Sequence, residues 1–193
     1  MPAATLGRLT TPSGPIERVA HGVYRLRGAP GPGLLDLRAA WLQLAPDVPA
    51  WRRTAAEGIV SHRSAAAVLW LGDLPADRHE FTVSHRRQTR RRDVRLHVRP
   101  LSGEDWTISD GMLVTRLHRL AADLLAGNED PSAVATIIAD GLDRGLAPAA
   151  SVARTIAPFA RRFGRPALDG AALVGYLLDS VGIDPTLHLT RIG

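Results

Sequence analysis

The chain has 193 residues, enough for one compact domain with an appended segment, and its 45% hydrophobic and 22% charged residues are ordinary for a globular protein. The chain has 24 arginines and no lysine. Its net charge of +5 and its pI near 11.0 indicate an acidic partner, either nucleic acid or protein. The absence of cysteine and lysine excludes disulfides, thiolate catalysis, cysteine-based zinc sites, a P-loop, a Schiff base and a standard protein-kinase lysine.

The first 33 residues predict an irregular arm, a hairpin and a linker. Prolines and glycines recur through residues 1–15, so no helical period survives there. Apolar residues between positions 16 and 26 lie on both sides of His21-Gly22, which predicts a short β-hairpin with Gly22 in its turn. The sequence GAPGPG at 28–33 predicts a linker.

The period becomes helical after the linker. Leu34, Leu37, Trp41 and Leu44 fall on one stripe of an amphipathic helix that ends before Pro46.

The central part of the chain predicts strands around a basic loop. Residues 59–75 indicate a buried strand end followed by a helix that Ser61 caps. The runs Phe81 to His85 and Val94 to Val98 alternate in polarity, and we predict that they form an antiparallel hairpin. That hairpin would have an apolar face and a basic tip at residues 86–92, and its basic face would carry Arg95, His97 and Arg99.

The remaining sequence predicts one more hairpin and then helices. Residues 106–114 turn at Asp110-Gly111. Thr115 is expected to cap a helix that ends at Gly127, and Asp130-Pro131 opens the next helix. Pro158 predicts a kink or break within 147–164. A last helix is expected at about 168–180, and residues 186–192 form a terminal strand or a loose tail.

These elements predict an α+β fold in three parts. The first is an irregular arm with a residual wing hairpin (1–33), the second an α+β domain with a central antiparallel β-sheet packed with helices (34–147), and the third a helical C-terminal region (148–193). The chain has no run of about 18 apolar residues and no apolar signal core at its start, so we expect a cytoplasmic protein without a membrane partner.

Several blocks, in this order, resemble the AbiEi-type antitoxin and transcriptional-regulator family. They are HGVYRL, VSHRSAAAVLWL, HEFTVSHRRQTRRRDVRLHV, DGMLVTRLHRLAADLL, ADGLDRGL and FGRPALDGAALVGYLLD, and they extend from about residue 16 to 182. The resemblance implies a winged helix-turn-helix that leads through a G-V-Y-R wing into an α+β domain with a helical tail. Only about 20 residues precede Gly22 here, whereas a winged helix-turn-helix needs roughly 50, so we expect the wing without its recognition helix.

The resemblance implies an antitoxin that neutralises a nucleotidyltransferase-type toxin, and direct binding is the expected mechanism. Two alternatives remain open at this point: a DNA-binding autorepressor of the operon, and an atypical serine/threonine protein kinase that phosphorylates the toxin. We expect no cofactor, no metal and no catalytic residue, and the partners are the cognate toxin and possible operator DNA. The sequence leaves the oligomeric state open.

The candidate binding residues are arginines. Five of them within one Debye length of about 8 Å repel one another unless an acidic group is near, although a solvated hairpin tip is the simpler interpretation of the loop. The predicted partner-binding set is Arg86, Arg87, Arg90, Arg91, Arg92, Arg95, Arg99, Arg161, Arg162 and Arg165, and the residual wing adds Arg18, Arg25 and Arg27. Nucleic acid would bind such a set through counterion release, and an acidic toxin cleft through electrostatic steering.

Three local patterns have structural interpretations. Ser61 and His62 are sequence neighbours whose side chains should diverge at a helix start, so we expect capping rather than Ser/His catalysis. His85 and His97 could meet across the predicted hairpin, but no third metal ligand is evident. The four tryptophans are expected to be core or interface anchors, and Trp51 is the one that we expect to be exposed.

Overall fold

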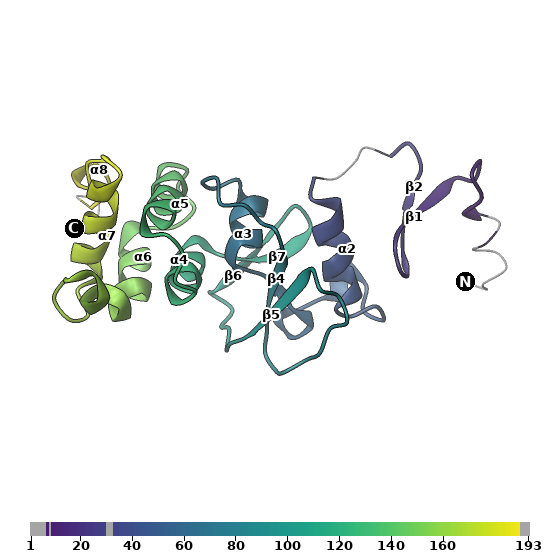
Figure 1. Cartoon of the computed structure of the whole chain (residues 1–193), viewed down its shortest axis with the longest axis horizontal. Helices are drawn as coiled ribbons and strands as arrows, with labels where there is room; N and C mark the ends of the chain where they lie inside the picture. Colours follow the sequence, from purple (N-terminus) through teal and green to yellow (C-terminus); the bar gives the residue numbers. More distant parts are fainter. Residues whose placement is uncertain (1–6, 8, 30–32, 190–193) are drawn as a thin grey trace.

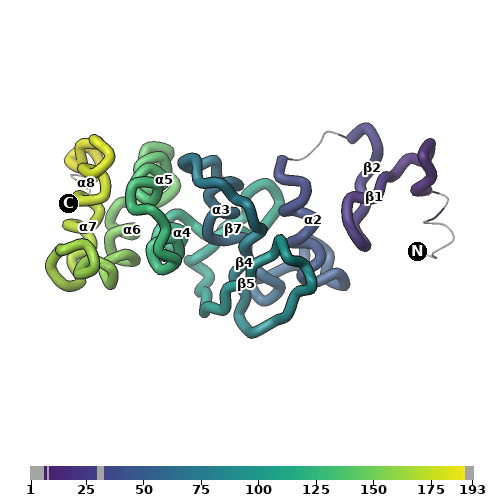
Figure 2. Tube along the Cα trace, viewed as in Figure 1, coloured from purple at the N-terminus to yellow at the C-terminus, as the bar shows by residue number. Residues whose placement is uncertain are grey.

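The computed structural model describes residues 7, 9–29 and 33–189 and confirms the α+β fold class. The chain progresses along the long axis of the molecule, from a two-stranded hairpin through a five-stranded sheet to a group of helices (Figures 1 and 2). Its strands are β1 (Ile16–Ala20), β2 (Val23–Leu26), β3 (Ile59–Val60), β4 (His79–Val83), β5 (Val94–Val98), β6 (Trp106–Ser109) and β7 (Met112–Thr115).

Helices surround the sheet and form the C-terminal part of the described chain. They are α2 (Leu35–Gln43), α3 (His62–Leu69), α4 (Leu117–Ala126), α5 (Pro131–Asp143), α6 (Ala149–Ile156), α7 (Gly170–Ser180) and α8 (Thr186–Leu189). Short 3-10 helices are η1 (Ala50–Arg52), η2 (Ala55–Glu57) and η3 (Ala157–Phe163). The expected break at Pro158 is confirmed, because the α-helical turns give way to η3 at Ala157.

Both predicted local hairpins are confirmed. Strands β1 and β2 pair antiparallel around His21-Gly22, and Gly22 has the positive φ of 74° that the turn requires. Strands β6 and β7 pair antiparallel around Asp110 and Gly111, whose φ angles of 47° and 68° suit a two-residue hairpin turn. In each case the turn residues fix the local geometry.

The prediction of a central antiparallel sheet is wrong in one respect, because the sheet is mixed. Its strand order is β5-β4-β3-β7-β6. Strand β4 pairs with β5 in parallel, with His79 opposite Val94 and Val83 opposite Val98, and β3 also pairs with β7 in parallel. Residues 84–93 therefore form a crossover loop that returns along the whole length of β4, not a hairpin tip.

The two faces of β4 are covered by different elements. Val83 and the α2-side residue Leu44 both lie beside Gly58, whereas Glu80 contacts the start of α3 through the backbone N–H of Arg63 at 3.1 Å. Side chains alternate along a strand, so α2 and α3 cover opposite faces. This double coverage explains why four of the five β4 residues are buried.

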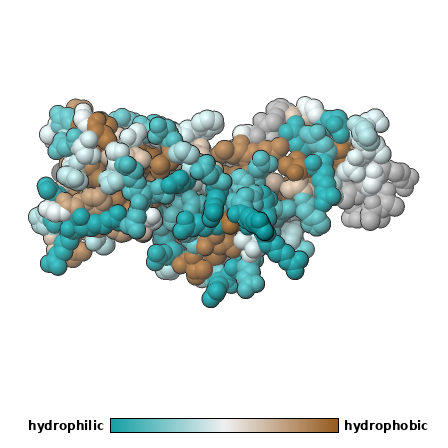
Figure 3. All heavy atoms as spheres, in the orientation of Figure 1, coloured by the Kyte–Doolittle hydropathy of each residue, from teal (hydrophilic) through white to brown (hydrophobic). Residues whose placement is uncertain are grey.

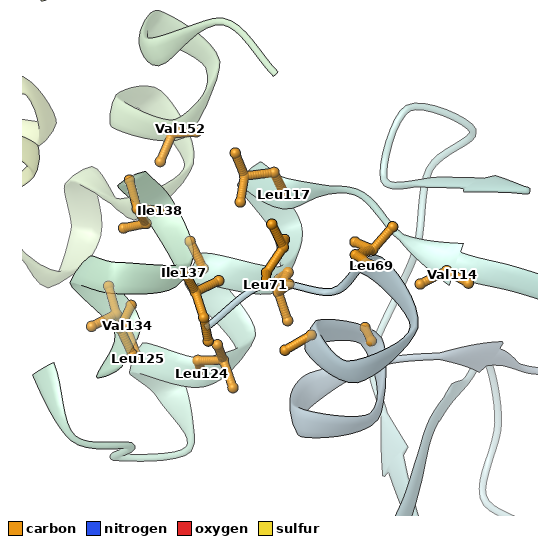
Figure 4. Packing of buried hydrophobic residues seen from close by; sticks show 14 of the residues in the cluster. Leu69, Leu71, Val114, Leu117, Leu124, Leu125, Val134, Ile137, Ile138 and Val152 are labelled. Carbon is orange, nitrogen blue, oxygen red and sulfur yellow. The ribbon is translucent and has the colours of Figure 1, made fainter. Parts of the chain in front are cut away.

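One continuous hydrophobic cluster joins the sheet to the C-terminal helices. Leu71 follows α3 and lies between Leu117, Leu124 and Ile137, as Figure 4 shows. The cluster extends from Leu37 in α2 to helix α7, so it includes both regions that the sequence suggested as separate domains. The boundary at residue 147 remains a prediction.

Several terminal and capping predictions need correction. Ser61 does occupy the N-cap position of α3, but its side chain makes no capping hydrogen bond. Thr115 is the last residue of β7, so the N-cap of α4 is Arg116, whose side chain also makes no capping hydrogen bond. Asp130 does cap α5 through Ser132, as expected. The tail contains α8 in place of a strand, and residues 190–193 lie outside the described residues.

The N-terminal arm is only partly described. Residues 10–15 form turns and bends, as an irregular arm should, while Gly7 and Leu9 are helical. The prediction for residues 1–6 and 8 lies outside the described part of the chain.

Candidate partner-binding surface

Arg87 holds the crossover loop to the body of the protein. Its guanidinium donates to the carbonyl oxygens of Leu44 at 3.2 Å, Glu57 at 3.3 Å and Ala56. These carbonyls belong to the end of α2 and to η2, which lie far from the loop in sequence. Arg87 is therefore a structural anchor and is unavailable to a partner.

Arg91 is a second anchor of the loop. It forms a two-pronged ion pair with the carboxylate of Asp93 and donates to Oε1 of Gln43 in α2 at 2.6 Å. The hydrogen bond from Arg91 lowers the pKa of Asp93 to about 2, so this carboxylate stays charged at neutral pH.

The other three loop arginines face solvent. Arg86, Arg90 and Arg92 are exposed, and each lacks a hydrogen bond or ion pair to any of the described residues. The two anchors therefore hold a loop whose three free guanidinium groups are open to a partner. We name Arg86, Arg90 and Arg92 the loop cations.

Strand β5 and the residue after it carry two more of the predicted arginines. Arg95 has a side chain that is 61% exposed, and its nearest carboxylate, Glu80, lies 4.0 Å away. Arg99 is also exposed, at the end of β5. Arg95 and Arg99 therefore lie on the α3 face of the sheet, whereas Arg87 and Arg91 hold the loop to α2 and η2, on the opposite face.

The wing arginines are paired within the hairpin. Glu17 lies 2.7 Å from Nε of Arg25 and 3.6 Å from Arg27, while Arg18 donates to the carbonyl of Ala20 at 3.3 Å. Their charge is thus partly neutralised on site. Within the described part of the chain, no hydrogen bond or ion pair joins them to the loop cations.

The C-terminal arginines belong to η3 and the residues just after it, within the group of helices at one end of the molecule, whereas β5 lies near its middle (Figure 1). Arg162 donates to the carbonyl of Leu125 at 2.8 Å, and Arg165 lies over the ring of Tyr176 at 5.0 Å. Arg161 is exposed and has no partner among the described residues. The predicted set therefore does not form one surface.

A buried polar cluster lies between β5, β4 and the start of α3, and the contact at its centre, between His62 and His97, was not predicted. His62 and His97 stack with ring centroids 3.5 Å apart, and Nε2 of His97 lies 3.0 Å from Glu80. Nδ1 of His62 lies 3.0 Å from Oγ of Ser61, so the expected divergence of these neighbours is wrong. The reason is the left-handed backbone of His62, with φ of 52°, which turns its ring toward the serine.

The cluster is inaccessible to a substrate. Ser61 is fully buried and His62 is 7% exposed. Burial, together with the nearby charge of His97, lowers the pKa of His62 to about 3 and keeps the imidazole neutral. Burial opposes ionisation of Glu80, but the hydrogen bonds from His97 and from the backbone N–H of Arg63 contribute to lowering the pKa of Glu80. His97 does not meet His85, which bonds to Ser84 and Arg87 in the loop.

Sequence analysis missed Arg53, the most buried of the arginines that the structure describes. Arg53 is 7% exposed, lies over the ring of Trp41 at 4.6 Å, and donates to the carbonyls of Trp41, Leu42, Ala45 and Val48 at the end of α2. It satisfies carbonyls that the end of a helix leaves without partners. No pattern in the sequence distinguishes it from Arg52, its exposed neighbour.

A groove of about 1090 Å³ lies between the hairpin, α2 and the crossover loop. Its lining includes Tyr24, Leu42, Arg53 and residues 88–91. Trp51, which is 84% exposed as expected, and Trp70, which is 79% exposed, are large apolar side chains at the surface, whereas Trp41 belongs to the core. The groove mixes apolar and charged walls.

Comparison with known proteins gives no relative: no protein-family model matches the chain, and no curated protein matches its sequence. Of the helices in residues 7, 9–29 and 33–189, none is both long and apolar enough to span a bilayer. Within the same described ranges, no group of three or more histidine, aspartate or glutamate side chains is arranged to hold a metal ion.

Proposed function

We propose that the chain is an antitoxin that neutralises a nucleotidyltransferase-type toxin by direct binding, with the loop cations in contact with an acidic region of that toxin. The proposal takes the class of partner from the ordered blocks that resemble the AbiEi-type family. It takes the contact surface from Arg86, Arg90 and Arg92, which are exposed and unpaired on an anchored loop.

The anchoring supports this choice of surface. Free arginine side chains on a mobile loop would lose much conformational entropy on binding, whereas a loop that is already held loses less. Arg87 and Arg91 provide that support through Leu44, Ala56 and Gln43. The loop cations are therefore positioned for a partner before it arrives.

Charge separation also supports the proposal. The three loop cations have no carboxylate partner among the described residues, and Arg95 has only a carboxylate at 4.0 Å. An acidic cleft would be steered toward such a surface, and the guanidinium groups suit bidentate contact with carboxylates.

Charge reversal of the loop cations tests the proposal. The variant Arg90→Glu/Arg92→Glu should fail to rescue cells that express the toxin, because like charges would then oppose the acidic cleft. Colony counts after toxin induction measure rescue. The loss should exceed about tenfold, because close charge pairs across an interface can couple by about 1.5 kcal/mol or more and each 1.4 kcal/mol is about tenfold in affinity.

A matched variant separates local from global charge. Arg52→Glu/Arg154→Glu changes the net charge equally, at two exposed positions outside the predicted partner-binding set. It should rescue as the unchanged chain does. Full rescue by Arg90→Glu/Arg92→Glu, at equal protein levels, would overturn the proposal.

A further inference from the structure

Strand β5 has a free edge. It is the last strand of the five-stranded sheet, and only β4 pairs with it. The bonds from His79 N–H to Asp93 O at 2.7 Å and from Arg99 N–H to Val83 O at 3.2 Å show which β5 residues face β4. Backbone groups alternate in direction along a strand, so Leu96 and Val98 point their N–H and C=O groups away from the sheet.

The side chains around this edge separate by polarity. Arg95 and Arg99 project on the face of Glu80 and α3, and both are exposed. Leu96 is half-buried and Val98 is 50% exposed on the other face. Figure 3 shows an apolar area beside the place that β5 occupies in Figure 1, with hydrophilic residues around it.

We propose that the free edge of β5 binds an extended acidic segment of the partner protein, which adds to the sheet as a sixth strand. Its backbone would pair with Leu96 and Val98, its acidic side chains would lie beside Arg95 and Arg99, and its apolar side chains would cover Val98. The required pattern is therefore alternating acidic and apolar residues.

Charge selects this occupant over a second copy of the chain. Two β5 edges that paired with each other would bring the arginines of both copies together, and like charges across a strand pair are destabilising. Arginine on an edge strand normally prevents such pairing. An acidic strand would instead form favourable charge pairs with Arg95 and Arg99.

This inference deepens the proposed function and rests on it for the identity of the partner. It adds the class of segment that the partner presents and the backbone groups that bind it. Arg92, the last of the loop cations, lies two residues before the start of β5.

A peptide probe tests the edge without any toxin. A seven-residue peptide of alternating glutamate and valine, with blocked ends, should slow hydrogen exchange of the Leu96 and Val98 amides in NMR spectra of the full chain. The corresponding peptide with lysine in place of glutamate should not bind. Equal protection by an oligothymidylate, without protection by the acidic peptide, would overturn the inference in favour of nucleic acid.

Two edge variants identify the strand. Val98→Pro removes an N–H that does not bond to β4, and an edge strand tolerates proline at such a position. It should weaken binding of the acidic peptide by at least about tenfold, because a hydrogen bond is lost and the ring obstructs pairing. Ile108→Pro is the matched control on β6, the other edge strand. The side chain of Ile108 is 68% exposed and its N–H points away from β7, so this variant should bind the acidic peptide as the unchanged chain does.

A charge exchange keeps the test valid if a proline variant fails to fold. Arg95→Glu/Arg99→Glu should reverse the preference, so that it binds the lysine peptide and not the glutamate peptide. An unchanged preference, or equal peptide binding by folded Val98→Pro, would overturn the docking edge. Failure of the unchanged chain to rescue cells from the toxin would instead overturn the proposed function and leave the peptide result standing.

Discussion

His62 is a buried titratable residue at the start of a helix. Its ring stacks on His97, and the charged or titratable groups around it are His97, Glu80, Arg95 and Arg119. Water cannot solvate an imidazolium at this position, so the folded protein keeps the ring neutral. Its protonation is thereby coupled to unfolding.

We predict that this coupling makes the protein less stable in mild acid. The pKa of His62 is about 3 in the folded protein and about 6.5 when exposed, so the unfolded chain binds one more proton between these values. The contribution to the free energy of unfolding is complete above pH 6.5 and is lost as the pH falls toward 3. The expected slope is on the order of 1 kcal/mol per pH unit, measured by urea unfolding from pH 7.5 to 5.

A pair of histidine variants isolates the effect. His62→Gln should be less stable than the unchanged chain at pH 7.5, but its stability should fall less steeply with pH. His85→Gln, at an exposed loop position, should keep the full slope. Burial also lowers the pKa of His79 and His118, and both contribute equally in every variant. Equal slopes for His62→Gln and the unchanged chain would contradict the prediction.

Neighbouring arginines show how far a single residue can be predicted. Arg86 and Arg87 are adjacent in a uniformly basic run, yet one faces solvent and the other donates to three distant carbonyls. Arg52 and Arg53 differ in the same way. The basic run itself is evident in the sequence, but the role of each guanidinium depends on which carbonyls the fold brings near.

In the crossover loop, the difference between an exposed and an anchoring arginine can be measured. Residues 84–93 contain five arginines, each a site for trypsin, and Arg87 ties the loop to α2 and η2. Cleavage of a folded protein follows local opening, whose free energy the anchor raises.

We therefore predict that Arg87→Ala accelerates tryptic cleavage within the loop by about tenfold, because hydrogen bonds to three carbonyls are lost. Mass spectrometry of limited digests identifies the cut and gives its rate. Arg86→Ala also removes one trypsin site, but this exposed residue anchors nothing, so its digest should match that of the unchanged chain. Similar rates for both variants would show that Arg87 does not hold the loop.

Elements differ in how well their pairing can be predicted. The two hairpins have short turns with Gly22 or Gly111 at positive φ, so turn chemistry alone fixes an antiparallel pair. Strands β4 and β5 have the same alternation in either direction, and a ten-residue connection permits both. In the parallel pair this connection is held to α2 and η2 by Arg87 and Arg91, contacts that a local sequence pattern does not include.

At the scale of the whole molecule, the sheet and the C-terminal helices depend on one core. Leu71 and Ile137 lie in the same cluster as Leu124, and Gly72 N–H donates to Asp140 at 2.8 Å across the same junction (Figure 4). Separating the sheet from the C-terminal helices would therefore expose apolar side chains of both parts to water. The helix periods predicted the buried face of each helix, but a period cannot indicate which apolar faces meet.

We predict a single unfolding transition for the described regions. All four tryptophans precede α4, so their fluorescence reports on the sheet side, while far-ultraviolet circular dichroism reports mainly on the later helices. The two signals should give the same urea midpoint, because the core is shared.

Ile137→Ala should lower both midpoints together, with a loss of about 3 kcal/mol in the free energy of unfolding, since Ile137 is fully buried at the junction. Leu187→Ala, at a side chain that is 68% exposed, should change it by less than about 0.5 kcal/mol. Two separate midpoints, or a shift of only the dichroism signal in Ile137→Ala, would show that the two parts unfold independently and that the junction carries little of the stability.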